Sequence, residues 1–522
     1  MRVVRGVDQR YDVVIVGGGV GGYAAACVLA DRGVRVAIVE FTDRLGGQLT
    51  AQAVPSDEHP WIEQCGATRR YLDFRKAVRD HARTWSITAE ARARPYLNPG
   101  GGWVSTICHP PALAQHLLES RLPEPVDVML HASPVSADAV DGRVRAVTFA
   151  TPTARFTLEA SVWIDATELG DLLPLAGIPF VTGFEAQGET GEALAPSVAQ
   201  PDNWQAVTWV FAMAHDPGSH RVIDRPEDYD RWRNYRPEFW PGPLLGFQDV
   251  HPITLQPRHL PLFPNVDGTG GRLGLFAYRQ IVDPTLYESD APYAATIVNW
   301  PMNDYFVRPI LTPEGALDPV AMAEAKTLSR CLLYWLQTEA PRHDGGTGYP
   351  GLFLAPSLVG TSDGFAAFPY IRESRRIRAR TTITTASVAA DADPSATIGH
   401  TWPDSVGVGA YRIDLHPSTG GDNYIDVSAR PFSIPAGALV PQIGGNVIAG
   451  AKNIGTTHLT NGCYRLHPVE WAIGEAAGHL AARALVHGQP EAVVSQPGRV
   501  AELQADLLRD GAPIAWPKLH AL

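Results

Sequence analysis

Residues 12–40 read DVVIVGGGVGGYAAACVLADRGVRVAIVE, and this stretch decides the fold. Residues 12–16 form an apolar, β-branched run of the kind that makes a strand buried on both faces of a parallel sheet. Gly17, Gly19 and Gly22 then occupy the three fixed places of a GxGxxG motif, and the alanine-rich segment 23–32 is compatible with a helix. A second β-branched run, residues 35–39, ends at Glu40. This order of strand, glycine turn, helix, strand and acid predicts a dinucleotide-binding unit.

Each glycine of the motif has a separate task in such a unit. Gly17 permits the tight turn, Gly19 lets the backbone approach a pyrophosphate, and Gly22 lets the helix and the strand pack closely. The free N–H groups and the positive dipole end of the helix favour phosphates without any lysine. The acid lies close to the offset of about 20 residues at which it meets a ribose hydroxyl. The residues predicted to contact the dinucleotide are Gly17, Gly19, Val20, Gly21, Gly22 and Glu40. The agreement of all these parts disfavours the alternative, a glycine-rich turn without a ligand.

Composition limits the function classes. The chain has 522 residues, more than the roughly 250–300 residues that one hydrophobic core supports, so two or more lobes are expected. Its formal net charge of −12 lacks the basic footprint that phosphate polymers require, which argues against nucleic acid as a partner. The five cysteines show no CxxC pair and no regular spacing, so we predict no metal site, no disulfide framework and a cytoplasmic setting. Without a signal-peptide pattern or an apolar stretch of about 18 residues, no membrane insertion is predicted.

The motif alone does not separate FAD from NAD, because both cofactors present the same pyrophosphate. Residues 44–50, RLGGQLT, follow the acid closely; glycines there allow backbone to lie against a flat ring, and Arg44 is expected to reach a phosphate. This segment resembles the loop after the second strand in glutathione-reductase-type flavoproteins. Residues 163–171 (WIDATELGD) and 446–455 (NVIAGAKNIG) extend the resemblance. It implies that the middle segment returns to the nucleotide-binding sheet and that the late one holds the flavin ribityl chain.

The same resemblance implies contacts at both ends of the cofactor. Val135 lies where such proteins hold the adenine by backbone contacts, with an ordinary strand end as the alternative. Residues 467–478 are similar to the helix whose N-terminus faces the pyrimidine edge of the flavin, where its dipole stabilises negative charge on reduction. The flavin-site residues that the resemblance implies are Arg44, Gly47, Gln48, Val135, Ala166, Thr167, Gly450, Asn453, His467 and Pro468.

More narrowly, the sequence resembles the bacterial FAD-dependent oxidoreductase family in residues 57–61 (DEHPW), 370–376 (YIRESRR) and 465–471 (RLHPVEW). The resemblance implies FAD as the cofactor. No second complete GxGxxG follows another strand, so a built-in NAD(P)H domain is not indicated. We predict an α/β fold with a Rossmann-like FAD-binding domain, discontinuous in sequence over residues 1–181 and 435–522, and an inserted mixed α+β substrate domain over residues 182–434.

Three histidines lie near the predicted flavin-facing segments. His416, His458 and His467 are each a candidate proton acceptor for an enzyme in which the flavin removes a hydride. We favour His458 and His416, because Pro468 gives His467 the setting of a helix start. The structural alternative for each is a histidine bonded to backbone at a loop or a helix cap.

Two further segments offer groups that could contact a substrate. Arg372, Arg375 and Arg376 form a basic cluster whose guanidinium groups match a carboxylate, with Arg372 as the catalytic candidate. The interleaved Glu373 favours the alternative, an ion-paired segment that joins the domains. Residues 300–305, WPMNDY, offer aromatic walls with amide and carboxylate groups, which core packing explains equally well.

These features predict an enzyme that moves two electrons from a small organic substrate to FAD and then to oxygen or an external acceptor. Two alternatives remain at the level of sequence. The first is a flavin monooxygenase that takes NAD(P)H from solution, and the second is a catalytically silent FAD-binding assembly subunit. Consumption of NADPH with substrate would indicate the first, and a bound flavin that no substrate bleaches would indicate the second.

Overall fold

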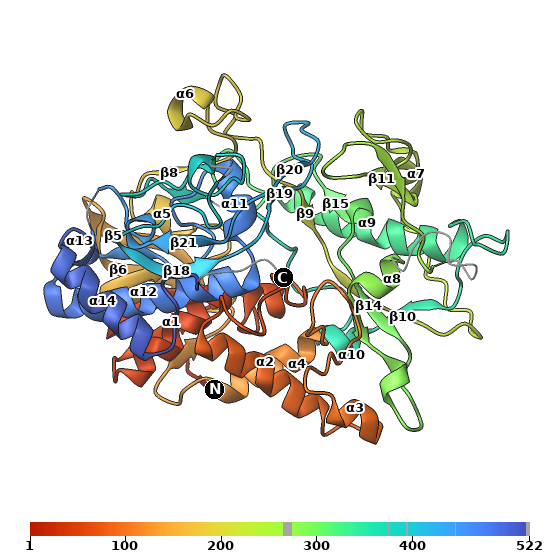
Figure 1. The fold of residues 1–522 in the computed structure, drawn as a ribbon, viewed down its shortest axis with the longest axis horizontal. Helices are drawn as coiled ribbons and strands as arrows, with labels where there is room; N and C mark the ends of the chain where they lie inside the picture. Colours follow the sequence, from red (N-terminus) through yellow and green to blue (C-terminus); the bar gives the residue numbers. More distant parts are fainter. Residues whose placement is uncertain (265–273, 374, 393–394, 444, 518–522) are drawn as a thin grey trace.

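The computed structural model describes residues 1–264, 274–373, 375–392, 395–443 and 445–517 (Figure 1). Its largest sheet has eight strands in the order β1-β4-β3-β2-β7-β6-β5, with β22 paired to β7. The strands are β1 (Arg2–Val3), β2 (Gln9–Val16), β3 (Val36–Val39), β4 (Asp127–Met129), β5 (Ser133–Val140), β6 (Arg143–Ala150), β7 (Arg155–Asp165) and β22 (Val447–Ala449). All pairings are parallel except β5 with β6 and β6 with β7. This arrangement confirms the predicted Rossmann-like α/β fold.

Helices cover the parallel strands, which explains their continuous apolar sequence. Residues Val13–Val16 of β2 and all of β3 are at most 1% exposed. Helices α1 (Val20–Asp31) and α12 (His467–His487) lie side by side against the sheet (Figure 1). They approach closely because both are glycine-containing: a Cβ atom at Gly474 would lie 2.1 Å from the Gly21 oxygen. The end of the chain therefore packs directly on the motif near its beginning.

A second lobe has a four-stranded antiparallel sheet in the order β13-β14-β10-β16, formed by Gln280–Val282, Ala295–Val298, Phe211–His215 and Leu352–Leu354. Its long helix α9, Pro319–Thr338, buries Cys331 in an aromatic-rich core. That core contains Leu169, residues between 204 and 371, and Tyr424, whereas Ile377 and many later residues belong to the core around the large sheet. The chain thus rejoins the first core near Ile377, ahead of the predicted domain boundary at 434.

Short elements complete the architecture. The remaining strands are β8 (Phe180–Val181), β9 (Val207–Thr208), β11 (Gln248–Val250), β12 (Pro257–His259), β15 (Asp304–Tyr305), β17 (Arg376–Ile377), β18 (Ser405–Gly409), β19 (Ile413–Leu415), β20 (Ile425–Val427) and β21 (Phe432–Pro435). The remaining helices are α2 (Arg69–Ala82), α3 (Ala89–Ala93), α4 (Pro111–Arg121), α5 (Leu172–Leu175), α6 (Gln187–Thr190), α7 (Tyr229–Asn234), α8 (Leu275–Tyr278), α10 (Pro356–Val359), α11 (His458–Tyr464), α13 (Pro490–Val494) and α14 (Pro497–Arg509). Within the described ranges, no helix is both long and apolar enough to cross a membrane.

Candidate active site

The glycine motif forms a turn that only small residues fit. Gly17 follows β2 with a φ of +99°, in the left-handed region that favours glycine. A Cβ atom at Gly22 would lie 2.0 Å from the Gly17 oxygen, and one at Gly21 would lie 2.0 Å from the Gly450 oxygen. Helix α1 can therefore sit directly on the loop and on the strand β22, with its N-terminal N–H groups at the carboxyl ends of the parallel strands.

The acid at the end of β3 stabilises the same loop. The Glu40 carboxylate accepts hydrogen bonds from the backbone N–H of Gly18 at 2.6 Å and of Thr42 at 2.9 Å. Burial raises the pKa of Glu40 to about 7. The carboxylate thus links the glycine turn to the chain that follows the second strand.

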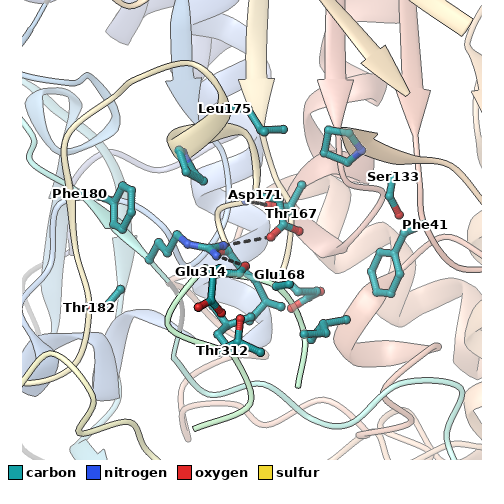
Figure 2. A pocket seen from close by; sticks show the side chains of 18 of the residues that line it. Phe41, Ser133, Thr167, Glu168, Asp171, Leu175, Phe180, Thr182, Thr312 and Glu314 are labelled. Carbon is teal, nitrogen blue, oxygen red and sulfur yellow. Dashed lines mark hydrogen bonds and ion pairs between the residues drawn. The ribbon is translucent and has the colours of Figure 1, made fainter. Parts of the chain in front are cut away.

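A cavity of about 620 Å³ opens beside the turn. One wall contains Gly17, Phe41 and residues 132–134, and Thr167 and Glu168 lie at its centre. Phe180 and Thr182 lie across from Phe41 and Ser133, with Thr312 and Glu314 between them (Figure 2), and residues 311–317 all line the cavity. The cavity lies at the carboxyl ends of β2, β3 and β7, which is the place where doubly wound sheets bind their ligands.

A buried cluster of charges borders the N-terminus of α1. The Lys452 ammonium contacts the Glu168 carboxylate and lies 3.5 Å from Oε2 of Glu470, while the Gln48 amide donates to Glu470. Oε1 of Glu470 in turn accepts from the Gly21 N–H at 3.4 Å. Burial opposes the charge of Lys452, but the two carboxylates outweigh it and raise its pKa, so the ammonium form persists. One cation therefore balances two acids at the helix end.

A second cavity, of about 370 Å³, lies between the second lobe and the β19–β20 hairpin. Arg465 and Asp57 connect it to the start of α12: Arg465 lies two residues before His467, and the Asp57 N–H donates to Nδ1 of His467 at 3.1 Å. The Gln48 amide also donates to the Arg465 oxygen, at 2.9 Å. Gln48 and His467, two of the residues predicted to face the flavin, therefore contact residues that line this cavity.

His416 lines the second cavity and has an acid behind it. Its Nδ1 lies 2.5 Å from Oδ2 of Asp304, whose Oδ1 lies 3.1 Å from Nη2 of Arg372. Strand β9 brings them together, because it pairs with β15, which contains Asp304, and the neighbouring Ala206 N–H donates to the Pro417 oxygen at 2.9 Å. The structure thus brings the predicted residues His416 and Arg372 into one site.

The protonation states in this site follow from the charges. Burial opposes ionisation of Asp304, but Arg372 and His416 hold its pKa below the usual value. Burial, assisted by the charge of Arg372, lowers the pKa of His416. Because the Asp304 carboxylate accepts from Nδ1, the neutral imidazole has Nε2 available as a base on the cavity side.

The family model for FAD dependent oxidoreductases matches residues 12–507, nearly the whole chain. This chain belongs to the FAD dependent oxidoreductase family. FAD is therefore its cofactor. A search of curated proteins finds no match.

Several solved structures resemble parts of this flavoprotein. p-Nitrophenol 4-monooxygenase PnpA from Pseudomonas putida DLL-E4 is 16% identical over 42% of this chain and 49% of its own, with a TM-score of 0.23. THI4 of Thermovibrio ammonificans is 20% identical over 36% of this chain and 75% of its own, with a TM-score of 0.23. The 3-ketosteroid-delta4-(5alpha)-dehydrogenase of Rhodococcus jostii RHA1 is 15% identical over 34% and 53%, with a TM-score of 0.20. The flavoprotein thus spans about half the length of the first and third structures.

FAD fits the residues of the first cavity in two respects. The cavity reaches the glycine turn and the ends of the strands, where side chains larger than glycine would collide with backbone. Oε1 of Glu168, which lines this cavity, is buried without a hydrogen-bond partner among the described residues, and so is Oε1 of Gln48, whose amide bonds to Glu470 beside the N-terminus of α1. Such atoms accept hydrogen bonds, and the hydroxyl groups of a ribityl chain or a ribose can donate them.

Other predicted residues of the flavoprotein have structural partners. The Arg44 guanidinium, which the sequence predicted to reach a phosphate, instead pairs with Asp43 at 2.6 Å and donates to the oxygens of Val359 and Gly360, and it does not line the first cavity. The two backbone oxygens that Arg44 binds belong to the C-terminal end of α10. Val135 is 39% exposed and lies beyond Ser133 and Pro134, which do line the cavity.

The loop after β22, residues 450–455, is hydrogen-bonded to the end of β7. The Asn453 amide donates to the Asp165 oxygen at 2.9 Å and accepts from the Ala451 N–H at 3.2 Å. The Gly450 N–H donates to the same Asp165 oxygen, and the Ala166 N–H donates to the Val16 oxygen. These contacts hold the loops in place around the N-terminus of α1.

The other two histidines lie outside the second cavity. His458 is 1% exposed, its Nδ1 lies 2.9 Å from Oε1 of Glu373, and its ring stacks on Phe184. His458 lies at a helix start, as the structural alternative expects, but its ring bonds to a carboxylate and not to backbone. Because it lines neither cavity, its catalytic role stays a prediction. In His467, Nε2 donates to the Val54 oxygen at 3.2 Å and burial lowers the pKa to about 3, so the ring stays neutral.

The three arginines of the predicted cluster separate. Arg375 lines the first cavity and pairs with Asp171, whereas Arg376 pairs with Glu185 and Glu373 in the interior. From the predicted pocket segment 300–305, Trp300 and Pro301 line the second cavity. Sequence reasoning missed Arg279 and Tyr424, because neither belongs to a motif whose spacing indicates chemistry. It also missed Lys452, which lies in the segment 446–455 but to which the resemblance gave no role.

Proposed function

We propose that this flavoprotein oxidises a small organic substrate in the second cavity and passes the two electrons to oxygen or an external acceptor. The observation that carries the proposal is the Nδ1 contact of His416 with Asp304, 2.5 Å long, in a cavity that borders the start of α12. General bases in enzymes are most often histidines whose other ring nitrogen an acid holds.

The residues have separate tasks in this proposal. The first cavity and the N-terminus of α1 would hold the adenosine and pyrophosphate, with Lys452 as the buried cation, and Gln48 and the start of α12 would hold the flavin end. FAD supplies a two-electron acceptor when it is bound. His416 accepts the substrate proton at Nε2, and Asp304 keeps the proton on Nδ1 and stabilises the imidazolium that forms.

The positive end of α12 and Arg465 lie at the same border of the second cavity. They favour negative charge that develops on the substrate or on the flavin as electrons arrive. The cavity volume, about 370 Å³, is at the lower end of ligand sites, which supports a small substrate.

The test is anaerobic titration of the FAD-loaded protein with alcohols, amines and carboxylic acids, followed by NADPH, while the flavin absorbance is recorded. Bleaching by an organic compound in the unmodified protein, with loss of at least about 100-fold in the bleaching rate in His416→Asn, supports the proposal. The exposed His220→Asn is the matched control. Bleaching by NADPH alone would instead indicate a monooxygenase, and a flavin that nothing bleaches would indicate a binding subunit.

A further inference from the structure

The second cavity contains a surplus of buried hydrogen-bond donors. Among its lining residues, the buried side-chain atoms without a partner in the described structure are Nε and Nη1 of Arg279, Nε of Arg372, Nε of Arg465, Nε1 of Trp300 and the Tyr424 hydroxyl. Every one is an N–H or O–H group, and no side-chain carboxylate or amide oxygen of the described lining residues is buried without a partner in the same way. A buried polar group without a partner costs free energy, so this set indicates a ligand rich in acceptors.

Arg279 is the least neutralised of the arginines in this cavity. The other four have acids at short range: Arg258 with Asp249 at 2.7 Å, Arg372 with Asp304 and Arg465 with Asp414 at 3.1 Å, and Arg412 in contact with Asp426. The nearest acid to Arg279 is Asp57, at 3.5 Å. Arg279 is nevertheless 91% buried, with two of its three nitrogens unpartnered.

Phenol groups line the same cavity as this guanidinium. Tyr278, Tyr370 and Tyr411 all do so, and the guanidinium carbon of Arg279 lies 5.1 Å from the centre of the Tyr278 ring. The Tyr370 hydroxyl already accepts from Nη1 of Arg465 at 3.0 Å, so its own proton is available to a ligand. A guanidinium with neighbouring phenol hydroxyls matches the two oxygens of a carboxylate.

We propose that Arg279 binds the carboxylate of a small 2-hydroxy acid and that His416 in the same cavity takes the proton of its hydroxyl group. This inference rests on the proposed function and names its substrate class. An amino acid is disfavoured, because the carboxylates that line the cavity, Asp57, Asp414 and Asp426, already pair with arginines, so an ammonium group would have to compete with those arginines for its acceptors.

The reaction balances with FAD as the oxidant. The C–H bond next to the carboxylate breaks, and its hydrogen leaves with the electron pair to FAD. The O–H bond breaks as well, and its proton goes to Nε2 of His416. The carbon–oxygen double bond forms, so the product is a 2-oxo acid, and the carboxylate bound to Arg279 stays unchanged.

The first arm of the test measures binding without turnover. Isothermal calorimetry of the FAD-loaded protein with oxalate, which contains the carboxylate but no oxidisable C–H bond, should show one site. Arg279→Gln should weaken oxalate binding about 10- to 100-fold, and Arg279→Lys, which keeps the charge but loses the fork, should weaken it less. The exposed Arg225→Gln should leave it unchanged. Unaltered oxalate affinity in folded, FAD-loaded Arg279→Gln would overturn the inference.

The second arm compares substrates by anaerobic flavin bleaching. Small 2-hydroxy acids should bleach the flavin faster than the primary alcohols of the same length and than the matching 2-amino acids, and Arg279→Gln should raise KM more than it lowers kcat. If alcohols or amino acids bleach it and 2-hydroxy acids do not, the oxidoreductase proposal stands and the substrate class is wrong. If oxalate binds through Arg279 but no organic compound bleaches the flavin, the carboxylate site stands, whereas the hydroxy acid reaction and the proposed function both fall.

Discussion

Nδ1 of His416 lies 2.5 Å from Oδ2 of Asp304, although the two residues are 112 positions apart in the sequence. The contact exists because β9 pairs with β15, which contains Asp304, and Ala206, the residue before β9, donates its N–H to the Pro417 oxygen next to His416. A base that is fixed by a buried acid keeps one tautomer, so its free nitrogen always faces the same direction. The predictions on catalysis follow from this pair.

Asp304→Asn should lower the rate of flavin bleaching by at least about 100-fold while FAD remains bound. The amide can donate to Nδ1, which would place the imidazole proton on Nε2 and leave no base on the cavity side. Stopped-flow absorbance under anaerobic conditions measures this rate. Asp138→Asn, an exposed acid that pairs with Arg145, is the control. A bleaching rate within threefold of the unmodified protein would show that Asp304 does not position the base.

The pH profile of kcat/KM should have an acidic limb below pH 6.5, the ordinary pKa of histidine, because burial and Arg372 lower the pKa of His416. Protonation removes the base, so activity falls as the pH falls through that lowered value. Arg372→Met removes a positive charge and should move the limb to higher pH. Steady-state rates between pH 4.5 and 8 give the acidic limb of the unmodified protein and that of Arg372→Met. A limb that stays in place in Arg372→Met would contradict the electrostatic coupling.

Gly22→Ala should prevent normal packing of α1, because the new Cβ atom would lie 2.0 Å from the Gly17 backbone oxygen. Backbone cannot move away as a flexible side chain can, so we expect a loss of about 3 kcal/mol in the free energy of unfolding and a loss of FAD from the purified protein. Urea unfolding and the ratio of flavin to protein absorbance measure these quantities. Gly188→Ala, with open space around it, should change the free energy of unfolding by less than about 0.5 kcal/mol. Equal effects of the two substitutions would refute the packing argument.

Lys452→Met should weaken FAD binding by about 100-fold, because it leaves the carboxylates of Glu168 and Glu470 without their cation beside the phosphate-binding helix end. Fluorescence titration of the FAD-free protein gives the dissociation constant. The double variant Lys452→Met with Glu470→Gln removes one of the two negative charges and should recover part of the affinity. If the folded double variant binds FAD as weakly as Lys452→Met does, the charge of this cluster does not govern FAD affinity.

His467 should make the protein more stable as the pH rises from about 3 to 6.5. Burial lowers its pKa in the folded state to about 3, whereas the unfolded chain keeps the ordinary value near 6.5. The unfolded chain therefore binds an extra proton in this window, and the contribution of His467 to stability is full above pH 6.5 and is lost as the pH falls toward 3, by up to roughly 4–5 kcal/mol. His467→Gln cannot titrate, so its free energy of unfolding should depend less on pH in this range. Parallel slopes for the two proteins would disprove the assignment.

The sequence predicts the fold well where local chemistry has a fixed spacing. The glycine motif, β2, β3 and the acid Glu40 can be recognised because turn, packing and ribose contact require particular residues at particular positions. His416 was also accessible, because it lies near the flavin-facing segments in sequence. Arg279 could not be recognised from the sequence. Its surroundings form only when α8, β19 and Arg465 come together in the folded chain, and no local sequence pattern indicates these contacts.

Arg44 and His458 show why the remaining site predictions differ from the structure. A cation beside a glycine loop is a reasonable phosphate ligand, but Asp43 and two backbone oxygens of the region around α10 compete for the Arg44 guanidinium. Glu373 and Glu185 likewise occupy the ring and the backbone N–H of His458. Except for Asp43, which is adjacent to Arg44, these competing partners lie 85 to 316 positions away in the sequence, so tertiary packing rather than residue type decides the role.

The pairing of β22 with β7 and of α12 with α1 has a consequence for biosynthesis. A ribosome that has translated the chain as far as residue 446 has made the glycine motif but neither the strand nor the helix that completes its surroundings. While the second lobe is synthesised, the nascent sheet therefore lacks β22, and the cofactor site lacks the helix α12. We expect FAD to bind only late in synthesis, after both elements have been made and have packed beside the glycine motif.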